Sequence, residues 1–129
     1  MPDIIINMKE LTKAEENIMQ VLWKLKKGFV HDVLKELPNP RPSYTTVSTI
    51  IRILEKKGLA GYKAYGKTHE YFPLISKEEY TKTKANKLLK NYFENSIEKM
   101  ISFFVNEKKI DIMELDKIFK LIEKQKEKK

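Results

Sequence analysis

The sequence contains no cysteine, only four glycines and no long apolar run. The absence of cysteine excludes disulfides, thiolate metal sites and a cysteine nucleophile. The four glycines do not form either of the usual phosphate-binding loops. No stretch approaches the ~18 apolar residues of a membrane span, and the opening residues lack the apolar core of a signal peptide. We therefore expect a cytoplasmic protein that does not insert into a membrane.

Groups for catalysis or metal binding are equally scarce. The two histidines, His31 and His69, fall in separate predicted elements, and without cysteine they make a poor metal site. The carboxylates of Glu78 and Glu79 are explained by the preference of acidic side chains for the first turn of a helix. The sequence shows no set of nucleophile, base and orienting group, so we expect neither an enzyme nor a bound cofactor or metal.

The 129-residue chain carries a net charge of +8, and this charge is unevenly distributed. Residues 1–37 are neutral, with six lysines and six acidic residues. Residues 38–72 have a net charge of +4 from six basic and two acidic residues. Residues 73–129 also have a net charge of +4, but from fourteen basic and ten acidic residues. The middle segment is the cleaner positive patch, which favours a polyanionic partner such as nucleic acid. A lysine-rich surface that serves only solubility would show the same total charge.

The hydrophobic pattern predicts three short helices in the first part of the chain. The first covers residues 11–27, begins at a capping box of Thr12 and Glu15, and ends at Gly28 in a left-handed conformation. The second is short and covers residues 30–37, since the prolines that follow forbid its continuation.

A third helix and a hairpin come next. Residues 44–57 carry apolar positions at helical spacing, and Ser43 precedes them as an N-cap. Two β-type runs, residues 59–65 and 68–72, then flank a glycine–lysine pair that suits a type II′ turn. This order predicts a mainly α fold, a winged helix-turn-helix domain with a small β-hairpin wing, in which the third helix enters the major groove of DNA.

The C-terminal part predicts a helical dimerisation domain, residues 75–129, after a winged-helix domain of residues 1–74. A long helix is expected over residues 77–104 and a last helix after Asp111, each with a wide apolar face. Such faces exceed what two helices bury against each other, which favours a twofold dimer. The alternative is that these helices fold back on the winged domain of the same chain. The side chains expected in the dimer core are Tyr92, Phe93, Ile97, Ile101, Phe104, Leu115, Ile118, Phe119 and Ile122.

The polar face of the third helix predicts contacts with DNA bases. Short hydroxyl side chains let a helix approach base edges closely, and an arginine pairs with guanine or holds a phosphate. The expected base-reading residues are Thr45, Thr46, Ser48, Thr49 and Arg52. Threonines at helix N-termini also serve as caps and surface residues, which is the competing explanation for Thr45.

Cations and hydroxyls around the third helix and on the hairpin predict contacts with the DNA backbone, which add affinity without sequence information. The residues expected in this role are Arg41, Tyr44, Lys63, Tyr65, Lys67 and Thr68. A sequence-specific repressor bound to a twofold-symmetric operator is the leading hypothesis. A protein-interaction module built on a winged helix and a non-specific architectural DNA binder are the alternatives.

Two stretches resemble the penicillinase-repressor family of transcriptional regulators, the BlaI, MecI and CopY type. Residues 11–25 read LTKAEENIMQVLWKL and, with the spacing E-x-x-x-M-x-x-L-W, resemble the first helix of that family. Residues 45–80 read TTVSTIIRILEKKGLAGYKAYGKTHEYFPLISKEEY and resemble its recognition helix, wing and entry to the dimerisation helix. The resemblance runs from about Leu11 to Ile122. It implies a bacterial, homodimeric repressor with a winged-helix domain and a helical dimerisation domain.

The resemblance also implies a route of induction. In the beta-lactam branch of the family, a membrane sensor-protease system signals through cleavage of the repressor at an Asn-Phe bond in the dimerisation helix. The matching stretch KMISFFV implies cleavage between Ser102 and Phe103, with serine in place of the asparagine. Phe103 and Phe104 fit equally well as part of the dimer core. The cysteine cluster that binds metal in the copper-responsive branch is excluded, because this chain has no cysteine.

Overall fold

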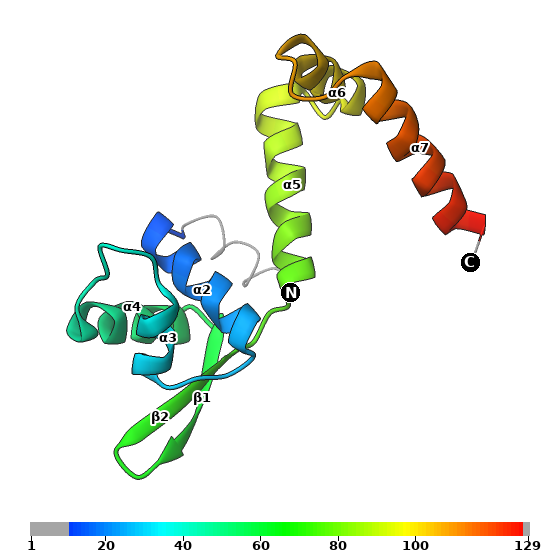
Figure 1. Ribbon diagram of the computed structural model, residues 1–129. Coiled ribbons are helices and arrows are strands. Elements are labelled where there is room, and N and C mark those ends of the chain that lie inside the picture. Colours follow the sequence, from blue (N-terminus) through cyan, green and yellow to red (C-terminus); the bar gives the residue numbers. More distant parts are fainter. Residues whose placement is uncertain (1–10, 128–129) are drawn as a thin grey trace. The chain divides into compact units, whose positions relative to one another are not determined.

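The computed structural model describes residues 11–127 (Figure 1). The opening residues, which were predicted to lack the apolar core of a signal peptide, lie outside this range. The elements follow in the order α2 (Lys13–Leu25), α3 (Val30–Glu36), α4 (Tyr44–Lys56), β1 (Ala60–Tyr65), β2 (Thr68–Pro73), α5 (Lys77–Phe93), α6 (Ile97–Asn106) and α7 (Ile112–Glu127). The chain divides into two compact units, Met1–Lys84 and Ala85–Lys129, so the first turns of α5 belong to the first unit. The proposed domain boundary between residues 74 and 75 stays a prediction.

Helix α2 begins as predicted but ends differently. The Thr12 hydroxyl accepts a hydrogen bond from the Glu15 amide at 3.1 Å, and the Glu15 carboxylate accepts one from the Thr12 amide at 2.7 Å. The prediction that Gly28 ends the helix in a left-handed conformation is wrong, because Lys26 adopts the positive φ of 73°. Gly28 instead pairs as a strand with Tyr71, through two backbone hydrogen bonds of 2.8 and 2.9 Å.

Both ends of α4 follow from local sequence signals. The Ser43 hydroxyl accepts a hydrogen bond from the Thr46 amide at 3.1 Å and so caps the N-terminus. At the other end Gly58 has a φ of 80°, and the Leu59 amide reaches back to the Leu54 carbonyl at 3.0 Å. This is a Schellman motif, in which a left-handed glycine closes the helix. The direction in which α4 enters and leaves the fold is therefore fixed by its own sequence.

The hairpin is a two-stranded antiparallel sheet joined by a two-residue turn. Tyr65 lies opposite Thr68, so Gly66 and Lys67 form the loop. Only Gly66 of this pair has a positive φ, 65°, which is the geometry of the predicted type II′ turn. Figure 1 shows the hairpin extending away from the three helices. Its tip is thus free of the core, whereas its base is paired with the turn between α2 and α3.

The core of the first unit lies between α2, α3, α4 and the base of the hairpin. Its fully buried side chains are Ile18, Met19, Leu22, Val33, Val47, Ile51, Leu54 and Leu59. The apolar positions Val47, Ile51 and Leu54 of α4 are buried, and Ile50 is half-buried. Three helices packed in this way and followed by a hairpin confirm the winged helix-turn-helix fold.

The prediction of one long helix over residues 77–104 is wrong. Glu94 and Asn95 adopt left-handed conformations, with φ values of 52° and 62°, and they separate α5 from α6. The Ser96 hydroxyl then accepts a hydrogen bond from the Lys99 amide at 3.1 Å and starts α6 as a new helix. The apolar periodicity continues across this interruption, which is why the pattern predicted a single helix.

The second unit has no buried side chain between residues 85 and 126. The rings of Phe93 and Phe103 lie 5.6 Å apart, and Asp111 caps α7 by accepting a hydrogen bond from the Glu114 amide at 2.7 Å. Large apolar side chains on α5, α6 and α7 are nevertheless open to solvent, as much as 75% in the case of Tyr92. A single copy of this unit therefore lacks a core of its own.

Candidate nucleic-acid interface

Three of the five predicted base-reading residues share the outward face of α4. Thr45, Thr49 and Arg52 are exposed and lie opposite the buried stripe of that helix. Their spacing of four and three residues places them one above another along the helix. The structure thus brings two hydroxyls and one guanidinium together on one exposed surface.

The other two residues point to the flanks of α4. Thr46 accepts a hydrogen bond from the Ser43 hydroxyl at 2.9 Å and lines an apolar cavity of about 300 Å³ beside α2 and the proline-containing loop. Ser48 is half-buried and lines a smaller hollow of about 120 Å³ on the side of the hairpin. That hollow is also lined by Tyr44 and Arg52 of α4 and by Lys67, Thr68 and His69 of the hairpin.

Arg52 lies close to Tyr71 of the hairpin. Burial raises the pKa of Tyr71, as does the negative charge of Glu55, while the charge of Arg52 and its hydrogen bond to Tyr71 oppose this rise. Arg52 and Tyr71 line the same hollow, and the five N–H donors of the guanidinium suit it for an acceptor on another molecule. Sequence reasoning missed this proximity, because the two residues belong to different elements.

Lys56 is a further basic residue that sequence reasoning missed. It is exposed in the last turn of α4. It follows Arg52 by four residues and Thr49 by seven, which places it on the same face of the helix. The helical spacing from Thr49 and Arg52 could have identified Lys56 from the sequence.

The predicted phosphate-binding residues of the hairpin share one face and its tip. The register pairs Tyr65 with Thr68 and, since alternate residues of a strand point the same way, also places Lys63 on this face. The Lys63 ammonium lies 5.3 Å from the centre of the Tyr65 ring, and the Thr68 hydroxyl donates to the Tyr65 carbonyl at 2.9 Å. Lys67 is exposed in the turn itself.

Aromatic side chains on the opposite face of the hairpin pack against one another. The Tyr62 and His69 rings stack at 4.1 Å, with 10° between their planes, next to the buried Tyr71. Tyr62 and Tyr71 therefore contribute to packing within the hairpin. Within residues 11–127 no group of three or more histidine or acidic side chains is arranged to hold a metal ion.

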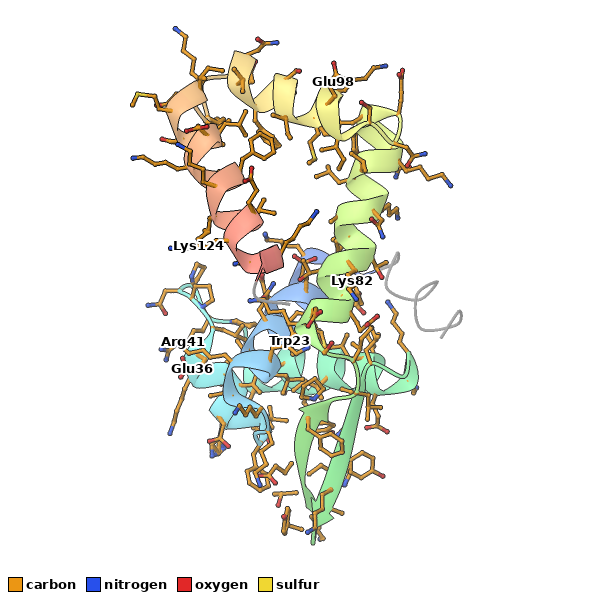
Figure 2. All side chains as sticks on the ribbon, turned by 90° about the vertical axis from the view of Figure 1, so that its right-hand side faces the viewer. Trp23, Glu36, Arg41, Lys82, Glu98 and Lys124 are labelled. Carbon is orange, nitrogen blue, oxygen red and sulfur yellow. The ribbon has the colours of Figure 1, made fainter. Side chains whose placement is uncertain are left out.

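The remaining predicted contacts precede or begin α4. Arg41 lies in the loop between α3 and α4, where it is labelled in Figure 2, and its Nε donates to the Leu37 carbonyl at 3.2 Å. Tyr44 is 52% exposed in the first turn of α4. Arg41 is therefore tied to the end of α3, whereas Tyr44 is open beside the hollow.

Comparison with protein families gives a match to the model described as penicillinase repressor, over residues 11–124. The chain belongs to the penicillinase repressor family. This confirms the family that the two stretches of sequence indicated.

Relatives within the penicillinase repressor family match over almost their full length. The penicillinase repressor of Bacillus licheniformis is 25% identical over 121 residues, which cover 93% of this chain and 94% of that protein. The methicillin resistance regulatory protein MecI of Mammaliicoccus sciuri is 21% identical over 116 residues, which cover 89% of this chain and 94% of that protein.

One solved structure shows a related fold over most of the chain. A complex structure of hsRosR-S1 covers 92% of this chain and 95% of that chain, with a TM-score of 0.53 and 19% identity. The solution structure of the DNA binding domain of the repressor BlaI covers 54% of this chain and 87% of that chain, with a TM-score of 0.48 and 30% identity. In the part of this penicillinase repressor family member that the structure describes, no helix is long and apolar enough to cross a membrane.

Proposed function

We propose that this chain is a cytoplasmic, homodimeric transcriptional repressor that binds a twofold-symmetric operator. Helix α4 lies in the major groove and the hairpin lies against the DNA backbone. The observation that carries this proposal is the exposed polar face of α4 beside a basic hairpin, in a winged fold of the penicillinase repressor family. The relatives in that family are themselves named as a repressor and a resistance regulator.

The two surfaces have different roles in this proposal. Thr45, Thr49 and Arg52 read base edges from the centre of the α4 face, with Thr46 and Ser48 at its flanks. The side chains that hold phosphates are Arg41, Tyr44, Lys63, Tyr65, Lys67 and Thr68. Specificity therefore comes from α4, and most of the sequence-independent affinity comes from the hairpin and the loop before α4.

Dimerisation is supported by the exposed apolar side chains of the second unit. Tyr92, Ile97, Ile118, Phe119 and Ile122 are each between 42 and 75% exposed. The other members of the predicted interface, Phe93, Ile101, Phe104 and Leu115, are half-buried or exposed. Large exposed apolar patches are unusual on a soluble monomer and mark interaction surfaces. A twofold partner covers them and places two α4 helices about 34 Å apart, one turn of DNA.

Selection of DNA from a library of random-sequence duplexes tests the proposal, combined with sedimentation of the free protein. We expect the selected duplexes to contain an inverted repeat and the protein to sediment as a dimer at micromolar concentration. DNA binding without any enriched sequence would instead indicate an architectural binder, and no DNA binding would indicate a protein-interaction module. A stable monomer would contradict the dimer.

A second part of the proposal concerns induction by proteolysis between Ser102 and Phe103. Both residues are exposed on α6, and the Phe103 side chain is 49% open. A protease needs an extended substrate, so this turn of α6 must open before cleavage. Co-expression with a membrane sensor-protease of the family's beta-lactam branch should produce a fragment that ends at Ser102, and the change Phe103→Asp should abolish it. Induction while the chain stays intact would contradict this route.

A further inference from the structure

The start of α5 is fastened to α2 at three points. The Trp23 indole Nε1 donates to the Ile75 carbonyl at 2.8 Å, and its ring lies 5.2 Å from the ring of Tyr80. The Tyr80 hydroxyl donates to the Glu16 carboxylate at 2.6 Å. All of these residues belong to the first unit. Figure 2 labels Trp23 where α2 meets the start of α5.

Burial and charge strengthen this attachment. Tyr80 is 4% exposed and is the one buried residue of α5. Burial raises the pKa of the Tyr80 hydroxyl, and the hydrogen bond to Glu16 raises it further. That same hydrogen bond lowers the pKa of Glu16, and Lys84 at 3.5 Å adds to the effect. A neutral hydroxyl therefore faces an ionised carboxylate, and such charge-assisted bonds are about twice as strong as neutral ones.

The same helix α2 also positions the DNA-reading helix α4. Ile18 and Leu22 of α2 are fully buried in the core that α4 completes, and the Glu15 carboxylate lies 3.1 Å from the Lys57 ammonium at the end of α4. The first turns of α5 and the whole of α4 are thus held by neighbouring faces of one helix. Their relative direction within the first unit depends on the contacts of α2.

We propose that Trp23, Tyr80 and Glu16 are positioning residues that set the distance between the two half-sites of the operator. The inference rests on the proposed dimeric repressor. Helix α5 runs without a break over 17 residues, about 25 Å, from this attachment toward the dimerisation residues. A tilt of about 10° at its start displaces its end by about 4 Å, more than the ~3.4 Å rise of one base pair. A loose attachment would therefore let the dimer bind half-sites at several different spacings.

Variants of the full chain separate this role from folding. The change Tyr80→Phe keeps a ring against Trp23 but removes the hydroxyl, and Glu16→Gln removes the charge that accepts it. Lys82→Ala is the matched control, because Lys82 lies on the same helix and forms ion pairs with Glu78 and Glu79 of α5 itself. Circular dichroism checks that each variant is folded before it is compared.

Each protein selects duplexes from the random-sequence library, and the spacing of the paired half-sites is counted. The wild type and Lys82→Ala should enrich one spacing strongly. In Tyr80→Phe, Glu16→Gln and the double variant, the preference for that spacing over spacings one base pair longer or shorter should fall about tenfold, the effect of losing one such hydrogen bond. Affinity for a duplex with a single half-site should stay within about twofold of the wild type, since α4 is untouched.

The fluorescence of Trp23 gives an independent readout, because it is the single tryptophan of the chain. Release of α5 exposes the indole, so emission of the variants should shift to longer wavelength. Retention of the wild-type spacing preference by the double variant overturns the inference. Failure of the wild type to select paired half-sites at all is a different result, which overturns the proposed function and this inference with it.

Discussion

The ion pair between Glu15 and Lys57 offers a sharp test of what holds α4 in place. Glu15 is the one buried charged residue in the described part of the chain, with 4% of its surface exposed. Its carboxylate lies 3.1 Å from the Lys57 ammonium and also accepts the Thr12 amide. The change Lys57→Met removes the positive charge and keeps most of the volume of the side chain. It leaves a carboxylate that cannot reach bulk water without opening the start of α2.

The expected loss of stability at about pH 7 is about 2 kcal/mol. Removal of one partner of a fully buried pair costs about 3–5 kcal/mol. The Lys57 side chain is 24% exposed, so part of this interaction is already screened by solvent. A loss near 2 kcal/mol is still about twice the upper limit of about 1 kcal/mol expected for an exposed pair.

The loss should shrink as the pH falls, and the sign follows from the pKa of Glu15. Burial alone raises this pKa, but the Thr12 amide and Lys57 together outweigh it, so the folded value lies below the ordinary 4.5. In the wild type, Glu15 thus contributes stability that is present above pH 4.5 and lost as the pH falls through the folded pKa. In Lys57→Met, the effect of burial on Glu15 is opposed only by the hydrogen bonds with Thr12, so the pKa of Glu15 is higher than in the wild type. Protonation of Glu15 at low pH then removes the buried, unpaired charge and with it the loss of stability.

Urea unfolding followed by Trp23 fluorescence measures this loss at about pH 7 and about pH 4, because Trp23 lies on α2, the helix that also carries Glu15. The control is Lys24→Met, which breaks an exposed pair with Glu36 and should cost no more than about 1 kcal/mol at either pH. An equal loss for Lys57→Met at both pH values would refute the reasoning, since it would mean that the charge of Glu15 does not depend on Lys57.

Other predictions concern DNA, the dimer and the end of α4. Arg52→Ala should lower affinity for the selected operator by about 1–3 kcal/mol and relax specificity at one base pair of each half-site. An equal loss on random DNA would instead make Arg52 a phosphate contact. Lys67→Ala should weaken operator and random DNA alike and make the salt dependence shallower by about one unit, which titrations at several salt concentrations measure. Ile101→Glu should produce monomers in sedimentation and weaken DNA binding, and a persistent dimer would contradict the proposed interface. Gly58→Ala should lower the free energy of unfolding by about 1–2 kcal/mol, because its φ is 80° although the space around it is open. An unchanged urea midpoint would count against this.

The winged-helix part was predictable because its signals are local. Ser43 and Gly58 mark the two ends of α4 through capping interactions within one turn of the helix. Gly66 supplies the positive φ of the hairpin turn. The outward face of α4 follows from the same period that buries Val47 and Ile51. These elements need no knowledge of the rest of the chain.

The errors arose where distant contacts or a short interruption decide the structure. Gly28 pairs with Tyr71, a partner far along the chain, so the left-handed position moved to Lys26. The break at Asn95 is hidden by apolar residues that continue at helical spacing on both sides. The bond from Trp23 to the Ile75 carbonyl has no sequence signature at all, because any residue supplies a carbonyl.

No side chain between residues 85 and 126 is buried, so in the proposed dimer the fraction of active protein depends on its concentration. In the proposed dimer the partner supplies the cover that the helices lack, so their stability depends on the concentration of the chain. Halving that concentration lowers the population of dimer by more than half in the range where monomers dominate, because two copies must meet. Loss of one copy also uncovers its partner. A modest fall in protein level would then release the operator more sharply than a monomeric repressor allows.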